Sequence, residues 1–324
     1  MPVSDYHVQE ATMKTMKAIV IHSYGGREVL ISEDVPVPEI TDDEILIRVH
    51  AAGVNPVDWK MRAGYLKEML PNKFPLILGW DVSGTVAKAG SNVTRLSVGD
   101  EVYALADVSR NGAYAEFIAV KADVVALKPK SLDHVHAASV PLAALTAWQA
   151  IFNSAELSEG QKILIHAAAG GVGSFAVQLA RWKGAYVLGT ASARNREFLL
   201  GLSADEVIDY TKTRFEDVAV DVDVVLDAIG GDTQERSWKT LKSGGILVSI
   251  LGPPDENKAA EFGVRGAGVF VQPDASHLAV IAQLIDSGHV KPVVTEVLPL
   301  EDVVKAHEMS ETEHVRGKIV LEVG

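Results

Sequence analysis

Through the first third of the chain, apolar residues recur at every second position. Ile45, Ile47 and Val49 share one face of such a stretch, which is the pattern of a half-buried strand. The pattern runs from Met16 to about Ala126, and turn-forming residues interrupt it throughout. These turns lie at Gly25-Gly26, Pro36, Pro38, Pro71, Pro75 and residues 98–100. The pattern predicts a mostly-β part, built as an antiparallel barrel or sandwich.

In the middle of the chain, short and fully apolar runs alternate with helical periods. Runs of this kind predict a parallel sheet that helices cover on both faces. Between the first two runs, Val172, Phe175, Ala176 and Leu179 recur at helical spacing, and Gly184 ends the helix. Six such strands predict a doubly wound α/β fold of the nucleotide-binding kind. The predicted strands are residues 163–167, 185–189, 206–209, 222–228, 245–251 and 268–271.

The last part of the chain returns to a mixed pattern, which we expect to rejoin the β-rich part. Leu278, Ile281 and Ile285 share one face of a predicted helix. A strand at residues 293–298, a helix from Glu301 and a closing strand from Lys318 follow. Because 324 residues exceed what one hydrophobic core usually holds, we predict two domains. Their predicted limits are residues 1–136 and 276–324 for the β-rich domain, with 1–15 as a loose extension, and 137–275 for the α/β domain.

The first strand of the α/β domain runs without a break into a glycine turn and a helix, with the sequence ILIHAAAGGVG. Gly170 and Gly171 have no Cβ, so the backbone can approach a pyrophosphate, whose charge the free N–H groups of a helix N-terminus stabilise. Gly173 lets the helix pack closely on the strand. We therefore predict that these glycines and Val172 bind a dinucleotide. Ala168 replaces the first glycine of the usual motif, and the alternative is that the glycines only shape a tight turn.

The end of the second predicted strand indicates which nicotinamide cofactor fits. An Asp or Glu there binds the ribose 2′-hydroxyl of NAD. This chain has TASARNR instead, and no carboxylate before Glu197. Ser192, Arg194 and Arg196 offer a hydroxyl and two guanidinium groups to a 2′-phosphate, so the sequence predicts NADPH. The alternative is that both arginines belong to a solvated helix start, although cations are disfavoured there unless an anion compensates them.

Composition argues against several other chemistries. The chain has no cysteine, which removes disulfides, thiolate catalysis and thiolate-bound zinc. Of the scattered histidines only His134 and His136 are close in sequence, so we predict no metal site. No G-x-S-x-G motif for a nucleophilic serine occurs. Hydride transfer remains the best-supported chemistry, because a nicotinamide needs little more than orientation, a dry pocket and a hydrogen-bond donor to the acceptor.

Charge and apolar patterning limit the partners and the location. The net charge is −13, from 30 Lys and Arg against 43 Asp and Glu, and it repels nucleic acids and anionic membranes. No apolar run approaches the length that spans a bilayer. Residues 1–16 contain no secretory core and little arginine. We expect a cytoplasmic protein with neither a nucleic-acid nor a membrane partner.

Several further motifs occur together in one order along the chain. With them, the chain from Met16 onward resembles the medium-chain dehydrogenase/reductase superfamily, and within it the zinc-free quinone oxidoreductase branch that includes zeta-crystallin. Zinc-dependent relatives carry Gly-His-Glu where this chain has Gly79-Trp80-Asp81, and their four-cysteine zinc lobe is absent here. The motifs are MKAI at 16–19, AGVNPVD at 52–58, GDEV at 99–102, GAYAEF at 112–117, PLAALTA at 141–147, AAAGGVG at 167–173, VIDY at 207–210 and GKIVL at 317–321.

The resemblance implies a GroES-like catalytic domain, a Rossmann cofactor domain and usually a homodimer joined along the Rossmann sheet. It also implies that Asn55 lies beside the nicotinamide and that Thr146 contacts the carboxamide. For Asn55 the alternative is an ordinary turn former, since Asn-Pro favours turns. The other implied cofactor contacts are Tyr210 and Arg196 at the adenosine phosphate end and Leu251 and Phe270 around the nicotinamide.

One departure from the branch lies on the substrate side. A tyrosine that often faces substrate there, five residues after the asparagine, is Lys60 in this chain. We predict that Asn55, together with Lys60 or the nearby Tyr65, stabilises an enolate or quinol oxygen, with Lys60 or Tyr65 donating a hydrogen bond; the alternative is that Lys60 is an exposed structural residue. The predicted function is zinc-independent, NADPH-dependent reduction of a quinone or an enone. The alternative function is that of an NADPH-binding structural or regulatory protein with little turnover.

Overall fold

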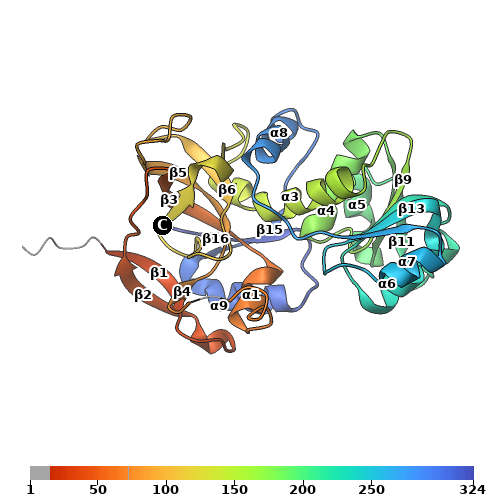
Figure 1. Ribbon diagram of the computed structural model, residues 1–324, viewed down its shortest axis with the longest axis horizontal. Helices are drawn as coiled ribbons and strands as arrows, with labels where there is room; N and C mark the ends of the chain where they lie inside the picture. Colours follow the sequence, from red (N-terminus) through yellow and green to blue (C-terminus); the bar gives the residue numbers. More distant parts are fainter. Residues whose placement is uncertain (1–14, 72) are drawn as a thin grey trace, which may run out of the picture.

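Two sheets form the β-rich part, which is the left half of the molecule in Figure 1. The computed structural model describes residues 15–71 and 73–324, so of the predicted extension only Thr15 is described, and it begins β1. The smaller sheet is antiparallel, with the order β2-β1-β4: β1 Thr15–Ile21, β2 Ile31–Pro36 and β4 Leu76–Ile77. The larger sheet has the order β15-β16-β3-β5-β6-β8, and β7 also pairs with β3. Its strands are β3 Glu44–Val54, β5 Asp81–Ala89, β6 Glu101–Leu105, β7 Phe117–Lys121, β8 Val125–Leu127, β15 Val294–Pro299 and β16 Lys318–Glu322.

The predicted alternation is present in the larger sheet. Ile45, Ile47 and Val49 of β3 are fully buried, whereas Arg48 between them is exposed. The predicted return of the C-terminal tail is confirmed, because β16 pairs antiparallel with β3 and β15 pairs parallel with β16. The C-terminal strands and β3 therefore share the larger sheet.

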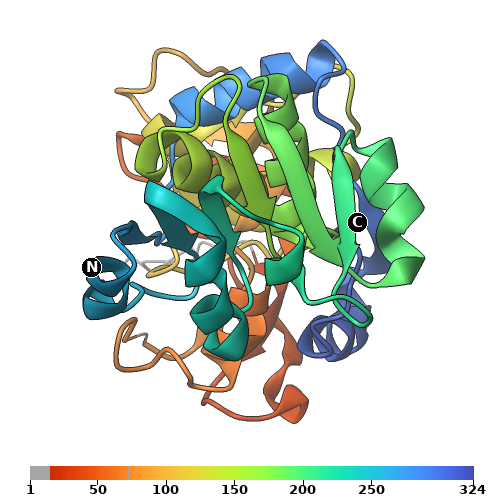
Figure 2. The same ribbon diagram turned by 90° about the vertical axis from the view of Figure 1, so that its right-hand side faces the viewer.

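The α/β part contains a parallel sheet with the strand order β11-β10-β9-β12-β13-β14, which is the doubly wound order that the sequence predicts. Helices cover both of its faces (Figure 2). Ile163 and Ile165 of β9 enter the core that contains Phe175 of α4, and Leu164 between them enters the opposite core with Trp238. The elements are β9 Lys162–Ile165, β10 Tyr186–Ala191, β11 Glu206–Asp209, β12 Val222–Asp227, β13 Leu241–Ser249, β14 Arg265–Gly268, α4 Gly171–Trp182, α5 Arg196–Gly201, α6 Gly231–Ser237 and α7 Glu256–Glu261.

The prediction for the sixth strand was wrong. The apolar residues 269–271 suggested a strand at 268–271, but the residues that pair with β13 are Arg265–Gly268. Small residues decide this register, because a Cβ at Gly268 would lie 2.7 Å from the backbone nitrogen of Pro253. The first strand also ends two residues earlier than predicted, at Ile165, because Ala167 has a positive φ of 49° and belongs to the turn.

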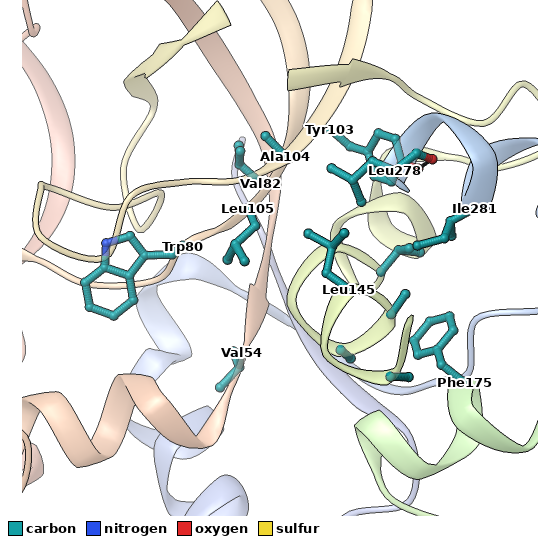
Figure 3. Close-up of a cluster of buried hydrophobic side chains, with 14 of the residues drawn as sticks. Val54, Trp80, Val82, Tyr103, Ala104, Leu105, Leu145, Phe175, Leu278 and Ile281 are labelled. Atoms are coloured by element: carbon teal, nitrogen blue, oxygen red, sulfur yellow. Dashed lines mark hydrogen bonds between the residues drawn. The ribbon is translucent and has the colours of Figure 1, made fainter. Parts of the chain in front are cut away.

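A shared apolar core joins the two parts (Figure 3). Leu145 of α3 lies between Leu105 of the larger sheet and Phe175 of α4, with Ile281 of α8 on the same side. Tyr103 adds a hydrogen bond from its hydroxyl to the backbone oxygen of Leu278, 2.6 Å away. The predicted domain limits stay predictions, since this core crosses them. The remaining helices are α1 Pro56–Arg62, α2 His134–Ala138, α3 Pro141–Trp148, α8 Ala275–Asp286 and α9 Val303–Glu311.

Short helical turns complete the fold: 3-10 turns at Arg27–Val29, Ala122–Val124, Ala193–Asn195, Phe215–Asp217, Trp238–Thr240 and Leu300–Asp302, and a π turn at Gln149–Ser154. No helix within the described ranges is long and apolar enough to cross a membrane.

Candidate functional site

Asn55 lies in a buried polar cluster where β3 ends and α1 begins. Its side-chain nitrogen donates to Oδ2 of Asp81 at 2.8 Å, and its side-chain oxygen accepts a hydrogen bond from Nζ of Lys318, the first residue of β16. Lys318 also forms an ion pair with Asp81 at 3.3 Å, and both side chains are almost fully buried. Because both ends of the Asn55 amide are held, its orientation is fixed. We call Asn55, Asp81 and Lys318 the amide cluster.

Asp81 is the link between this cluster and α3. Its second carboxylate oxygen accepts a hydrogen bond from the backbone N–H of Leu142, 2.7 Å away, in the first turn of that helix. Burial raises the pKa of Asp81, and the positive charge of Lys318 opposes this shift. Removing only one partner of a buried ion pair such as this one destabilises a protein strongly.

A second buried carboxyl group, that of Asp58, lies behind Asn55. Its Oδ2 accepts hydrogen bonds from the backbone N–H of Asn55 at 2.7 Å and from the hydroxyl of Tyr114 at 2.8 Å. Its Oδ1 has no hydrogen-bond partner among the described residues. Burial raises the pKa of Asp58 to about 7. This carboxyl group is therefore partly protonated at neutral pH. It lies in the first turn of α1, which begins directly after Asn55, the candidate nicotinamide contact.

The glycine turn between β9 and α4 has the geometry of an anion site. Helix α4 begins at Gly171 with Gly170 as its N-cap, and no described side chain caps it. The backbone N–H groups of its first turn, which includes Val172, are thus available to a phosphate. A Cβ at Gly173 would lie 2.4 Å from the backbone oxygen of Ala167, so only glycine fits there. The predicted strand, turn and helix are present; the binding roles of these residues stay predictions.

The tail of the chain reaches this turn directly. The backbone N–H of Gly317 donates to the backbone oxygen of Ala169 at 2.9 Å. The side chain of Lys318 lies beside Gly171, where a Cβ would be 3.1 Å from its Cδ. The amide cluster and the glycine turn are therefore neighbours, joined by the start of β16.

Three residues predicted for the adenosine end lie together at the carboxyl ends of β10 and β11, which are adjacent parallel strands. Ser192 directly follows β10 and is half-buried. Tyr210 follows β11 and is 55% exposed. Arg196 begins α5 and donates from Nη1 to the backbone oxygen of Val207 at 3.0 Å, which engages part of its guanidinium. Its remaining N–H groups stay available to a ligand.

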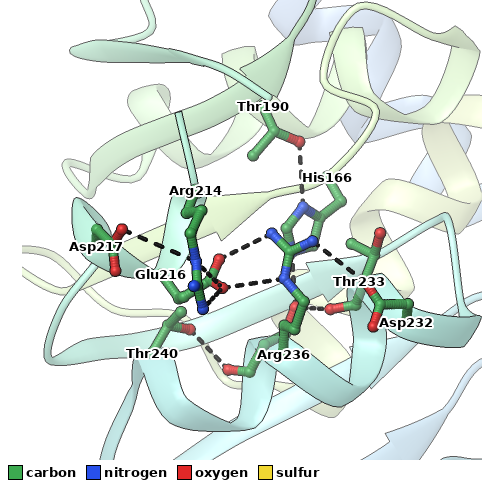
Figure 4. A network of polar contacts seen from close by, with 10 residues as sticks. His166, Thr190, Arg214, Glu216, Asp217, Asp232, Thr233, Arg236 and Thr240 are labelled. Carbon is green, nitrogen blue, oxygen red and sulfur yellow. Dashed lines mark hydrogen bonds and ion pairs between the residues drawn. The ribbon is translucent and has the colours of Figure 1, made fainter. Parts of the chain in front are cut away.

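A polar network around the buried His166 supports the end of β10 from the face of the sheet opposite α5 (Figure 4). His166, just after β9, contacts the hydroxyl of Thr190 at 3.1 Å and that of Ser237 at 2.8 Å. Burial lowers the pKa of His166 to about 4, so the ring is neutral at physiological pH. Arg236 and Glu216 form a two-pronged pair below it, with contacts of 3.0 and 2.8 Å. These contacts fix the strand end that precedes Ser192.

At the same carboxyl edge of the sheet, along its other half beyond β9, large apolar side chains remain half exposed. Leu251 and Phe270, which follow β13 and β14, are 53% and 52% exposed. Ile229, which follows β12, is 52% exposed and was not predicted, although its position after a neighbouring strand could have identified it. Thr146 is buried in α3 and donates from its hydroxyl to the backbone oxygen of Leu142 at 2.7 Å. Its hydroxyl oxygen can still accept from a carboxamide N–H.

Lys60 and Tyr65 gather around Trp59 rather than around Asn55. Nζ of Lys60 lies 5.4 Å from the Trp59 ring centre, and the Tyr65 ring meets it edge-on at 5.9 Å. Tyr65 is 73% exposed. Neither side chain has a hydrogen bond to Asn55 in the described part of the chain. The structure therefore brings Asn55 into the amide cluster, whereas Lys60 and Tyr65 contact Trp59.

Comparison with known proteins identifies the family of both parts. The family model described as alcohol dehydrogenase GroES-like domain matches residues 41–130, and the model described as zinc-binding dehydrogenase matches residues 202–321. The chain is 40% identical over 322 residues to the chloroplastic NADPH-dependent alkenal/one oxidoreductase of Arabidopsis thaliana. This alignment covers 95% of this chain and 80% of that protein. The chain belongs to the medium-chain dehydrogenase/reductase superfamily. The predicted resemblance is confirmed.

Two further members of the superfamily match along nearly the whole chain. The 2-methylene-furan-3-one reductase of Solanum lycopersicum is 38% identical, over 94% of this chain and 79% of that protein. The structure of the quinone oxidoreductase from Coxiella burnetii superposes with a TM-score of 0.89 at 38% identity, over 96% of this chain and 100% of that chain. The fold of a GroES-like domain with a Rossmann domain follows from these matches.

Besides Ile229, four residues of the buried clusters were missed in the sequence, namely Asp58, Asp81, Tyr114 and Lys318. Lys318 and Tyr114 lie inside the superfamily motifs GKIVL and GAYAEF, but nothing in either motif shows that its side chain meets Asn55 or Asp58. No group of three or more His, Cys, Asp or Glu side chains among the described residues could hold a metal ion.

Proposed function

We propose that this protein is an NADPH-dependent oxidoreductase that reduces the activated double bond of an enone or a quinone without zinc. The observation that carries the proposal is the direct contact between an uncapped glycine turn and the buried amide cluster, joined by Gly317 and Lys318. This arrangement suits a phosphate at the turn and places a fixed polar group beside it. The names of the Arabidopsis and tomato relatives, an alkenal/one oxidoreductase and a 2-methylene-furan-3-one reductase, support the same substrate class.

The residues present suit NADPH at each part of the molecule. The free N–H groups at the start of α4 suit the pyrophosphate, and Ser192, Arg196 and Tyr210 suit the adenosine phosphate end. The oxygen of Thr146 suits the carboxamide N–H. When bound, NADPH supplies the hydride for the reaction.

The protein's own residues orient the acceptor and handle its oxygen. Leu251, Phe270 and Ile229 offer apolar surface to the planar acceptor. Lys60 or Tyr65 donates a hydrogen bond to the oxygen on which negative charge develops, and a solvent proton completes the reduction. The amide of Asn55 is held by Asp81 and Lys318, so Asn55 would lie beside the nicotinamide ring in a fixed orientation and would not act as a mobile hydrogen-bond donor.

Following NADPH absorbance with purified protein against quinones, enones and simple ketones tests the proposal. We expect turnover with quinones or enones, slower turnover with NADH, and no loss after chelation. Lys60→Met and Tyr65→Phe then separate the two donor candidates, because only the true donor lowers kcat for the enone. Tight NADPH binding without turnover on any acceptor would instead support the structural or regulatory alternative, and loss of activity with chelator would contradict zinc independence.

Two further expectations belong to this proposal. The outer edge of β14 is free of strand partners within the described chain, and a second copy paired there would give a homodimer. Light scattering of the purified protein tests this, and a monomer mass would refute it. A cytoplasmic location also stays a prediction; several relatives carry mitochondrial or chloroplastic names, so cell fractionation is the appropriate test.

A further inference from the structure

The segment that follows β10 is contacted by an arginine from the far end of the chain. Arg316, in the loop between α9 and β16, donates from Nε to the side-chain oxygen of Asn195 at 2.9 Å and from Nη2 to the backbone oxygen of Arg194 at 3.3 Å. Its guanidinium also lies 5.2 Å from the ring centre of Phe198. Three separate contacts thus hold Arg316 against the segment that begins at Ser192.

The charges gathered here have no counter-charge. Arg194, Arg196 and Arg316 form no ion pair with any described residue, whereas Arg181, Arg214 and Arg236 in the same part of the fold all pair with carboxylates. The protein carries 43 acidic against 30 basic residues, so partners for arginine are abundant. The exposed Arg265 on β14 is also unpaired in the described structure but stands alone, whereas three unpaired guanidinium groups around one short segment indicate a site for an anion.

Space for an anion exists beside these groups. A hollow of about 420 Å³ is lined by Arg194, Asn195 and Arg316, together with His314 and residues of α9 and β15. The contacts of Arg316 to Asn195 and Arg194 use only some of its N–H groups, and the others have no described partner. Asp209, at the end of β11, accepts a hydrogen bond on Oδ1 from the hydroxyl of Thr211 at 2.7 Å, its Oδ2 has no hydrogen-bond partner among the described residues, and it pairs with none of the three arginines.

We propose that Arg316 completes the binding site for the 2′-phosphate of NADPH together with Arg194 and Ser192. The inference rests on the proposed function for the identity of the cofactor. It adds that both parts of the fold contribute a guanidinium group to the 2′-phosphate site, because Arg316 belongs to the C-terminal return and Arg194 to the Rossmann part. NADPH then holds these parts together in a way that NADH does not.

Calorimetric titration of the purified protein with 2′,5′-ADP and with 5′-AMP tests the inference without any need for turnover. We expect the wild-type protein to bind 2′,5′-ADP at least tenfold more tightly than 5′-AMP. Arg316→Gln should weaken 2′,5′-ADP about fivefold to tenfold and leave 5′-AMP unchanged. Arg316→Lys should recover part of the loss, since a charge remains but the two-pronged geometry does not.

Arg265→Gln is the matched control. Arg265 is an exposed arginine on β14, at the edge of the sheet away from β10, and it should change neither affinity. Equal weakening of both nucleotides by Arg316→Gln would overturn the inference, because the residue would then only support the segment. A wild-type protein that binds both nucleotides equally would refute the choice of NADPH itself, which separates failure of the proposed function from failure of this inference.

Discussion

Lys318 should be among the most sensitive polar positions in the protein. Its ammonium pairs with Asp81, and the side chains are 4% and 0% exposed. Lys318→Met keeps the apolar length of the side chain and removes the charge, which leaves a buried carboxylate without its cation. Loss of one partner from a buried pair costs about 3–5 kcal/mol of unfolding free energy. Lys17, whose pair with Asp34 is about 60% exposed, provides the matched control, and Lys17→Met should cost about 0–1 kcal/mol.

The loss should also depend on pH in a defined direction. Burial already raises the pKa of Asp81, and without Lys318 the pKa rises further. A group whose pKa is raised in the folded state contributes its stability at low pH and loses it as the pH passes the folded pKa. Lys318→Met should therefore be less damaging at pH 5 than at pH 8.

Denaturant unfolding of four proteins at both pH values checks this reasoning. The four are wild type, Lys318→Met, Asp81→Asn and the double variant, and their cycle isolates the pair. We expect a coupling energy of about 2 kcal/mol or more at pH 8. Two results would refute the idea that this pair anchors Asn55. One is a loss of unfolding free energy below about 1 kcal/mol for Lys318→Met, equal to that of the Lys17 control. The other is additive effects of the two single substitutions in the cycle.

Three other predictions follow from single positions. Because the pKa of Asp58 is raised to about 7 in the folded state, the unfolding free energy of the wild-type protein should fall as the pH rises from about 4 to 7, by up to about 1.4 kcal/mol per pH unit. In denaturant unfolding at several pH values, Asp58→Asn should show a weaker dependence of this free energy on pH. Gly173→Ala should lower the melting temperature and weaken NADPH binding in a fluorescence titration, because the new Cβ would lie 2.4 Å from the backbone oxygen of Ala167. Gly201→Ala is the control, since a Cβ there has open space, and it should change neither quantity. Phe175→Ala should cost about 3–5 kcal/mol in denaturant unfolding, since the ring is 1% exposed; a cost below 1 kcal/mol would contradict its place in the shared core.

The sequence predicts the Rossmann part well because its signals are local. Fully apolar strands, helical periods and a glycine turn each occupy one short window, and the order of the strands then follows from the handedness of their connections. The sixth strand is the exception, and it shows the limit of such signals. Residues 269–271 are more apolar than Arg265–Gly268, but the register depends on how closely Gly268 can approach Pro253, which no window of sequence contains.

The polar clusters of the site could not be predicted for a related reason. Asn55 and Lys318 are 263 residues apart, and Arg316 and Asn195 are 121 apart. Each of these residues alone has an ordinary local explanation as a turn former or a solvated cation. Only the pairing of β16 with β3, and the approach of the loop before it to α5, turns them into partners. Sequence pattern predicts where a strand lies, whereas tertiary packing decides which charged side chains it carries into contact.

The start of β16 is the point where these long-range contacts converge. Arg316 contacts the segment after β10, Gly317 donates to the glycine turn, and Lys318 holds the amide of Asn55. Three consecutive residues thus contact the segments that we propose for the adenosine end, the pyrophosphate and the nicotinamide end of the cofactor. The C-terminal return therefore contacts all three segments that we propose as the cofactor site, which supports the proposal that it helps to align the cofactor.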